Sequence, residues 1–149
     1  MTLLPINGSM DTSYKTIGGE DGVRALVDSF YNIMAQSPQG QTLFSMHTGD
    51  LHTTKDKLSR FLIGWMGGER TYQEHYGSLN IPMAHAHLNV TPDLVKAWLS
   101  CMRHALLELG YDQGFCDYLI NQLAIPAERI RLVSQQRHLM ESAREKSTL

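Results

Sequence analysis

The chain has 149 residues, and its 42% hydrophobic content is sufficient for the core of one domain. A formal net charge of −2 argues against nucleic acid or an anionic membrane surface as a partner. The longest run without a polar side chain, Phe61–Met66, is far too short to span a membrane. The two cysteines, Cys101 and Cys116, form no paired motif, which excludes a disulfide scaffold, a zinc ribbon and covalently attached haem.

The first half of the chain carries two helical periods. Apolar residues from Val23 to Met34 recur at spacings of three and four, which predicts a helix that ends at Ser37–Pro38. A second period from Leu58 to Trp65 predicts a helix that begins at Thr53 or Thr54. The strict alternation of apolar and polar residues that is typical of strands extends over no more than a few residues.

The second half begins with residues 69–90, which show no clean period and predict a long irregular segment of the kind that often carries function. Thr91–Asp93 is a helix start with proline at the first helical position, and Gly110 is expected to close that helix. A last helix begins near Phe115, and Pro126 is expected to break or kink it. We therefore predict an all-α fold with four substantial helices.

We expect a single domain over residues 1–149, with an N-terminal extension at 1–16 and a C-terminal helix end at 130–149. The mixed charges from Glu128 to Lys146 predict a solvated helix face and a fraying end rather than a binding patch. Because the N-terminus has no positively charged region followed by an apolar stretch, we expect a cytoplasmic protein.

Seven histidines stand out, because imidazole ligates metals and titrates near neutral pH. His85 and His87 could hold a metal ion from one face of a strand, but their side chains would diverge on a helix. Structural zinc takes about four ligands, and no second pair has a suitable spacing, which makes zinc the weaker interpretation. A single neutral histidine is sufficient as axial ligand of a haem iron if apolar walls and a few polar donors surround it. The helices around Tyr31, Phe61 and Trp98 could supply those walls.

Several blocks of the sequence resemble the truncated globins. The first block reads Gly-Gly-x-x-Gly-Val-x-x-Leu-Val-x-x-Phe-Tyr over residues 18–31. The second block consists of Phe61-Leu62, Gly67-Gly68 and Tyr72. His85, followed by Ala-Trp-Leu-x-Cys-Met at residues 97–102, is similar to the group II branch. The likeness covers residues 17–123 in order. It implies a globin-like, two-over-two helical sandwich around a b-type haem.

The resemblance also implies roles for individual residues. His85 is expected to ligate the iron, while Tyr31 and Trp98 face the bound ligand from the distal side. His47 falls at the corner between two helices, and Met46 takes that position if the alignment shifts by one residue. The remaining expected haem contacts are Leu51, Thr54, Lys57, Leu58, Phe61 and Tyr72.

The chain departs from the family beside the proximal histidine. Ala84 precedes it and His87 follows two residues later, where relatives often carry arginine and proline. An arginine there could pair with a haem propionate, so a different side chain has to make that contact. Lys57 is the first candidate, because its position is basic in relatives, and Lys55 and Tyr72 are the others.

The resemblance implies reversible binding of dioxygen, nitric oxide, carbon monoxide or peroxide. Donors aimed at charge on the ligand slow its release, which favours redox chemistry of these ligands over bulk oxygen transport. The alternatives are a true peroxidase or nitric oxide dioxygenase, or a haem-based gas sensor. Electrons would then come from a separate reductase, since the chain has no flavin or nicotinamide motif. A haem-free helical interaction module would leave Tyr31, His85 and Trp98 around an empty pocket.

Overall fold

The computed structural model describes residues 12–46, 49–77 and 89–147 of the chain. Every regular element within these residues is a helix: α1 (Ser13–Ile17), α2 (Gly19–Gln36), α3 (Gln41–Ser45), α4 (Leu51–Trp65), α5 (Tyr72–Tyr76), α7 (Pro92–Glu108) and α8 (Gln113–Ser147). The predicted all-α class is confirmed, and α2, α4, α7 and α8 are the four substantial helices. None of the helices in these ranges has the length and apolar character needed to cross a membrane.

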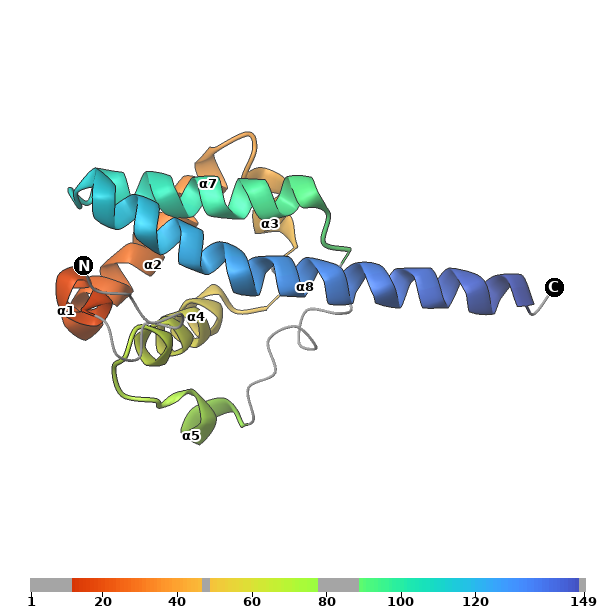
Figure 1. Cartoon of the computed structure of the whole chain (residues 1–149), viewed down its shortest axis with the longest axis horizontal. Coiled ribbons are helices and arrows are strands. Elements are labelled where there is room, and N and C mark those ends of the chain that lie inside the picture. Colours follow the sequence, from red (N-terminus) through yellow and green to blue (C-terminus); the bar gives the residue numbers. More distant parts are fainter. Residues whose placement is uncertain (1–11, 47–48, 78–88, 148–149) are drawn as a thin grey trace, which may run out of the picture.

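The four long helices form two layers (Figure 1). α2 packs against α4 in one layer, and α7 packs against α8 in the other. α2 also packs across the layers against α7, which makes it the central helix. Its buried residues recur every three or four positions and therefore share one broad face: Val23, Leu26, Val27, Phe30, Tyr31 and Met34. This arrangement is the predicted two-over-two sandwich.

The junction between α1 and α2 depends on two glycines. Gly18 has a φ of 102°, a left-handed conformation that favours glycine, and its backbone N–H caps α1. Gly22 lies so close to Ile17 that an added Cβ would stand 1.8 Å from the Ile17 carbonyl oxygen. The same oxygen accepts a hydrogen bond from the Tyr111 hydroxyl, which ties this junction to the link between α7 and α8. The glycine spacing in the first sequence block is therefore a packing requirement.

α4 begins earlier than the sequence predicts. Its first residue is Leu51, so the predicted start at Thr53 or Thr54 is wrong. The Asp50 carboxylate accepts hydrogen bonds from the backbone N–H groups of His52 and Thr53, and this cap starts the helix before the apolar period begins.

The second half of the chain differs from the prediction in two places. α5 is a short helix inside residues 69–90, for which the sequence predicts no regular element. Pro126 lies inside α8, so of the two predicted outcomes at that residue, a break or a kink, the break is wrong. A proline removes one backbone hydrogen bond from a helix. The burial of Leu123 before it and of Ser134 after it fixes both parts of α8 to the rest of the molecule and keeps the helix continuous.

A charged network joins α2, α4 and α5. The Asp56 carboxylate accepts hydrogen bonds from Arg24 at 3.1 Å and from Arg60 at 2.8 Å. The Tyr76 hydroxyl of α5 donates to the same carboxylate at 2.6 Å, and Arg60 also donates to the Thr71 hydroxyl at 2.8 Å. Burial by itself would raise the pKa of Asp56, but these hydrogen bonds outweigh it and hold that pKa well below its ordinary range. Since α5 has no buried residue, this network is what fixes it to α4.

We predict that Gly22→Ala destabilises the protein by about 3 kcal/mol, because its Cβ would force the Ile17 backbone away from α2. Gly19→Ala is the control for steric contact, since nothing lies within 4 Å of a Cβ added at Gly19, although Gly19, unlike Gly22, has a positive φ of 69°. We expect Gly19→Ala to lower the free energy of unfolding by about 1 kcal/mol. Urea unfolding followed by circular dichroism measures both, and equal losses would contradict the packing explanation.

We predict that Asp56→Asn lowers the free energy of unfolding by about 2 kcal/mol at neutral pH, because three charge-assisted hydrogen bonds weaken. The stabilisation from a depressed carboxyl pKa is complete above the ordinary value of 3.8 and is lost as the pH falls below it. The difference in the free energy of unfolding between the wild type and the variant should therefore become smaller as the pH falls below 3.8. Urea titrations at several pH values test this, and a gap that does not change with pH would refute the assignment to Asp56.

Candidate functional site

Tyr31 and Trp98 both contact one buried ring, that of Phe30. The Phe30 ring meets the Tyr31 ring at a centroid distance of 5.1 Å and the Trp98 ring at 5.2 Å, both edge to face. Tyr31 is 4% exposed, whereas Trp98 is half-buried and packs against the core from α7. Burial raises the pKa of Tyr31, so its phenol stays neutral and keeps its proton. The structure therefore brings the two predicted distal residues together across the two layers.

One face of α4 carries four of the predicted haem contacts. Leu51, Thr54, Leu58 and Phe61 recur every three or four residues, and Trp65 continues the same face. Their side chains are partly exposed, although Leu58, Phe61 and Trp65 pack against the core. The residues that α4 buries lie on a neighbouring face: Ser59, Leu62 and Ile63. α4 packs closely on α2 and α5 but not on α7 or α8, so this apolar face is only partly covered by the described residues.

The two predicted contacts at the start of α4 are placed differently from the rest. The Thr54 hydroxyl donates to the backbone oxygen of Asp50 at 3.1 Å, so it is used within the first turn of the helix. Leu51 is 37% exposed. Thr54 can therefore offer a methyl group and a small volume to a neighbouring group, while its hydroxyl supports the helix.

The candidate propionate anchors separate into two groups. The Lys57 ammonium lies 5.2 Å from the centroid of the Tyr76 ring, and the Tyr72 ring centroid lies 5.2 Å from that of Tyr76. Lys55 points the other way and forms an ion pair with Asp28 of α2 at 3.3 Å. The structure thus places Lys57 and Tyr72 together at the junction of α4 and α5, and it directs Lys55 toward α2.

Two central predictions lie outside the described residues. These are His85, the predicted iron ligand, and His47, the predicted corner residue; Ala84 and His87 lie outside them as well. Met46, the alternative corner residue, ends α3 and is partly buried. Among the residues that the structure does describe, no three His, Cys, Asp or Glu side chains gather closely enough to hold a metal ion.

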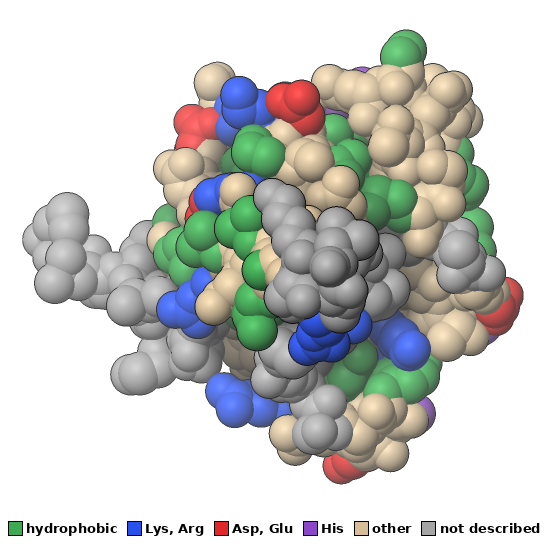
Figure 2. All heavy atoms as spheres, turned by 90° about the vertical axis from the view of Figure 1, so that its right-hand side faces the viewer, with side chains coloured by type: hydrophobic (Ala, Val, Ile, Leu, Met, Phe, Trp, Pro, Cys, Tyr) green, Lys and Arg blue, Asp and Glu red, His purple; other side chains and the backbone are tan. Residues whose placement is uncertain are grey.

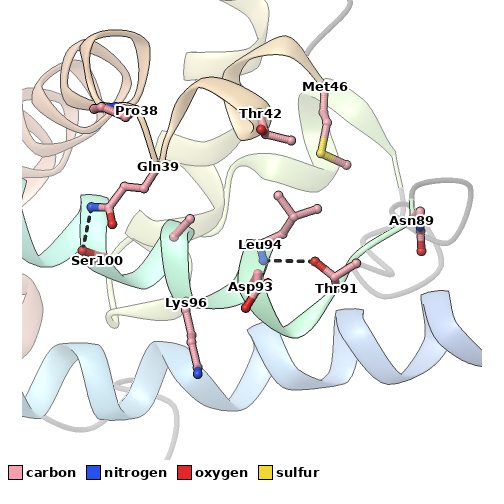
Figure 3. Close-up of a pocket in the computed structure, with 11 residues that line it drawn as sticks. Pro38, Gln39, Thr42, Met46, Asn89, Thr91, Asp93, Leu94, Lys96 and Ser100 are labelled. Carbon is pink, nitrogen blue, oxygen red and sulfur yellow. Dashed lines mark hydrogen bonds between the residues drawn. The ribbon is translucent and has the colours of Figure 1, made fainter.

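A hollow in the described part of the molecule lies elsewhere (Figure 3). It has a volume of about 680 Å³ and opens between α3, the turn before it and the start of α7. Two hydrogen bonds join residues of its lining: Gln39 donates to the Ser100 hydroxyl at 3.0 Å, and the Leu94 N–H donates to the Thr91 hydroxyl at 3.2 Å. None of the predicted haem contacts lines it apart from the alternative corner residue Met46. We therefore do not place the functional site there.

Several residues that shape the site are not among the predicted haem contacts. Phe30 contacts the two polar aromatic side chains, and Trp65 stacks on Phe61 with centroids 6.4 Å apart. The signal for Trp65 was present, since it follows Phe61 at a spacing of four. Phe44 on α3 packs against the same core from the side of the corner residue.

The described residues fit a haem by their chemistry. A porphyrin needs apolar walls with few polar groups, and charged groups at its solvent-facing edge. The partly covered face of α4 supplies Leu58 and Phe61 as walls, and Lys57 lies near the edge of that face. Tyr31 and Trp98 add a neutral hydroxyl and an indole N–H, which suit a small uncharged ligand.

Comparison with known proteins also indicates a haem protein. Residues 12–131 match the bacterial-like globin family. The chain is 30% identical over 122 residues to the group 2 truncated hemoglobin YjbI of Bacillus subtilis, which covers 82% of this chain and 89% of that protein.

Solved structures also match. The truncated oxygen-avid haemoglobin from Bacillus subtilis is similar with a TM-score of 0.70 and 30% identity, over 79% of this chain and 97% of that one. The group II 2-on-2 hemoglobin from Agrobacterium tumefaciens gives a TM-score of 0.73 and 27% identity, over 80% and 92% of the two chains. Together with the two-layer fold and the paired Tyr31 and Trp98, these matches show that the chain belongs to the bacterial-like globin family as a group II truncated haemoglobin, and thus as a haem globin.

Proposed function

We propose that the chain holds a b-type haem against the outer face of α4, with His85 as the iron ligand, and that it binds dioxygen and other diatomic ligands reversibly. When bound, the haem supplies the iron at which a diatomic ligand attaches. The observation that carries the proposal is that Tyr31 and Trp98 both contact the buried Phe30 ring, because two side chains with hydrogen-bond donors then share one apolar neighbour. In this proposal the haem is bound to the protein without a covalent bond, since Cys101 and Cys116 are both free and buried. The cytoplasmic location expected from the N-terminal sequence stays a prediction.

Tyr31 and Trp98 have different capacities as hydrogen-bond partners. The indole of Trp98 can only donate, whereas the phenol of Tyr31 can donate to one group and accept from another. Because burial raises the pKa of Tyr31, its phenol stays protonated and can act as a hydrogen-bond donor toward a group that carries partial negative charge. Low polarity around both groups strengthens each hydrogen bond. His47 is the third proposed member of this network.

The other predicted contacts would hold and orient the cofactor. Leu51, Thr54, Leu58 and Phe61 would form the wall on the α4 side and exclude water from it. Lys57 and Tyr72 would meet the propionates at the junction of α4 and α5, where the structure places both side chains beside Tyr76.

We further propose that the physiological role is redox chemistry of oxygen, nitric oxide or peroxide rather than bulk oxygen transport. A carrier has to release oxygen readily, and several donors around one ligand oppose release. The description of the Bacillus subtilis relative as oxygen-avid supports this direction. Electrons would come from a separate reductase. Steady-state turnover with peroxide or nitric oxide distinguishes a peroxidase or a nitric oxide dioxygenase from a ligand-binding protein.

We predict that Tyr31→Phe and Trp98→Phe each raise the oxygen dissociation rate by about tenfold or more, because each removes one hydrogen bond to a partly charged ligand. Stopped-flow replacement of oxygen by carbon monoxide in the haem-loaded protein measures that rate. Tyr14→Phe on α1 is the control, since it removes a hydroxyl from another partly buried tyrosine. An unchanged rate in both site variants would refute the proposed network.

A further inference from the structure

Lys57 lies at one edge of the apolar face of α4 that carries the proposed haem contacts. Each residue turns a helix by about 100°, so Lys57 lies about 40° from Phe61 and about 60° from Thr54 around the helix axis. Asp56 lies about 100° from Lys57 on the other side. Lys57 therefore stands between the apolar face and the charged network that is centred on Asp56.

The charged network does not take up the Lys57 ammonium. The Asp56 carboxylate already accepts hydrogen bonds from Arg24, Arg60 and the Tyr76 hydroxyl. Among the residues that the structure describes, no carboxylate forms an ion pair with Lys57. The Lys57 side chain is exposed, so a positive charge remains at the edge of the apolar face.

The Lys57 ammonium instead contacts an aromatic ring. Its Nζ lies 5.2 Å from the centroid of the Tyr76 ring, within the distance at which a cation is attracted to the face of a ring. The Tyr76 ring is itself held in place, because its hydroxyl donates to Asp56 at 2.6 Å and the Tyr72 ring lies beside it at a centroid distance of 5.2 Å. Figure 2 shows basic side chains next to hydrophobic ones at the surface just above α5, which forms the lower edge of that view.

We propose that Tyr76 is a positioning residue, whose ring holds the Lys57 ammonium at the edge of the α4 face for contact with a haem propionate. This proposal rests on the proposed haem site, and Tyr76 acts through Lys57 rather than by contact with the cofactor. A lysine side chain has many rotamers, and fixing one of them costs conformational entropy. A ring that restricts Lys57 before haem binds lowers that cost, so the haem is retained longer.

An aromatic ring suits this role better than a carboxylate would. A carboxylate beside Lys57 would neutralise its charge and compete with the propionate for its N–H groups. The face of the Tyr76 ring attracts the ammonium from one side and leaves N–H donors of Lys57 available to a second group. The carboxylate of Asp56 contributes indirectly, since it fixes the ring through the Tyr76 hydroxyl.

Two substitutions at Tyr76 isolate the contribution of the ring. Tyr76→Phe and Tyr76→Leu both remove the hydroxyl and its hydrogen bond to Asp56, but only Tyr76→Leu also removes the ring. We expect haem to leave the Tyr76→Leu chain about threefold faster than the Tyr76→Phe chain. Transfer of haem from the loaded full chain to an excess of apomyoglobin measures the rate. Circular dichroism shows whether both variants fold, and α5 buries no residue whose loss would open the core.

A double-mutant cycle shows whether the ring acts through Lys57. In a Lys57→Met background, the Tyr76→Phe and Tyr76→Leu chains should release haem at the same rate. In a Lys55→Met background, the difference of about threefold should persist, because Lys55 pairs with Asp28 on the side of α2. A ring that only stabilised α5 would keep its effect on haem release in both backgrounds.

The outcomes separate this role from the proposed function. Equal rates for Tyr76→Phe and Tyr76→Leu, slower release from Tyr76→Leu, or a difference that survives Lys57→Met would each overturn the positioning role while the wild type still binds haem. A wild-type chain that shows no Soret band with haem would overturn the proposed function, and the positioning role with it.

Discussion

The burial of α2 on two sides is the constraint on which the rest of the structure depends. Its apolar face contacts α4 in its own layer and α7 in the other, so both layers are positioned by one helix. Tyr31 lies on that face beside Phe30, and the Phe30 ring also contacts the indole of Trp98. The packing that holds the two layers together therefore also sets the polar groups of the site.

Charge complements this packing where apolar contact is lacking. α5 buries no side chain, yet Asp56 holds it to α4 through Tyr76 and holds α4 to α2 through Arg24. Lys55 adds a second tie to α2, which leaves Lys57 on the side of α5 and Tyr76. The proposed cofactor wall on α4 is thus supported from behind by ion pairs and faces the site with apolar residues.

Helical periodicity was sufficient to predict the four long helices, because burial on one face repeats every three or four residues in the sequence. Their arrangement in two layers was predicted only from the resemblance to the truncated globins. Residues that act through side-chain hydrogen bonds were not predictable in this way. The Asp50 cap moved the start of α4. The spacing of four between Asp56 and Arg60 is that of an ion pair on a helix, but nothing in the sequence indicates that Tyr76 joins them. The proposed roles of His85 and His47 rest on resemblance and lie outside the described residues.

Haem titration of the purified chain tests the central claim, that His85 and the face of α4 form a haem site, most directly. The visible absorption spectrum is followed as haem is added, first in the ferric and then in the reduced state, with and without oxygen. Our account predicts a sharp Soret band that saturates at one equivalent and a stable spectrum under oxygen, both lost in His85→Ala. The absence of a Soret band at equimolar haem, or a His85→Ala spectrum identical to that of the wild type, would contradict it.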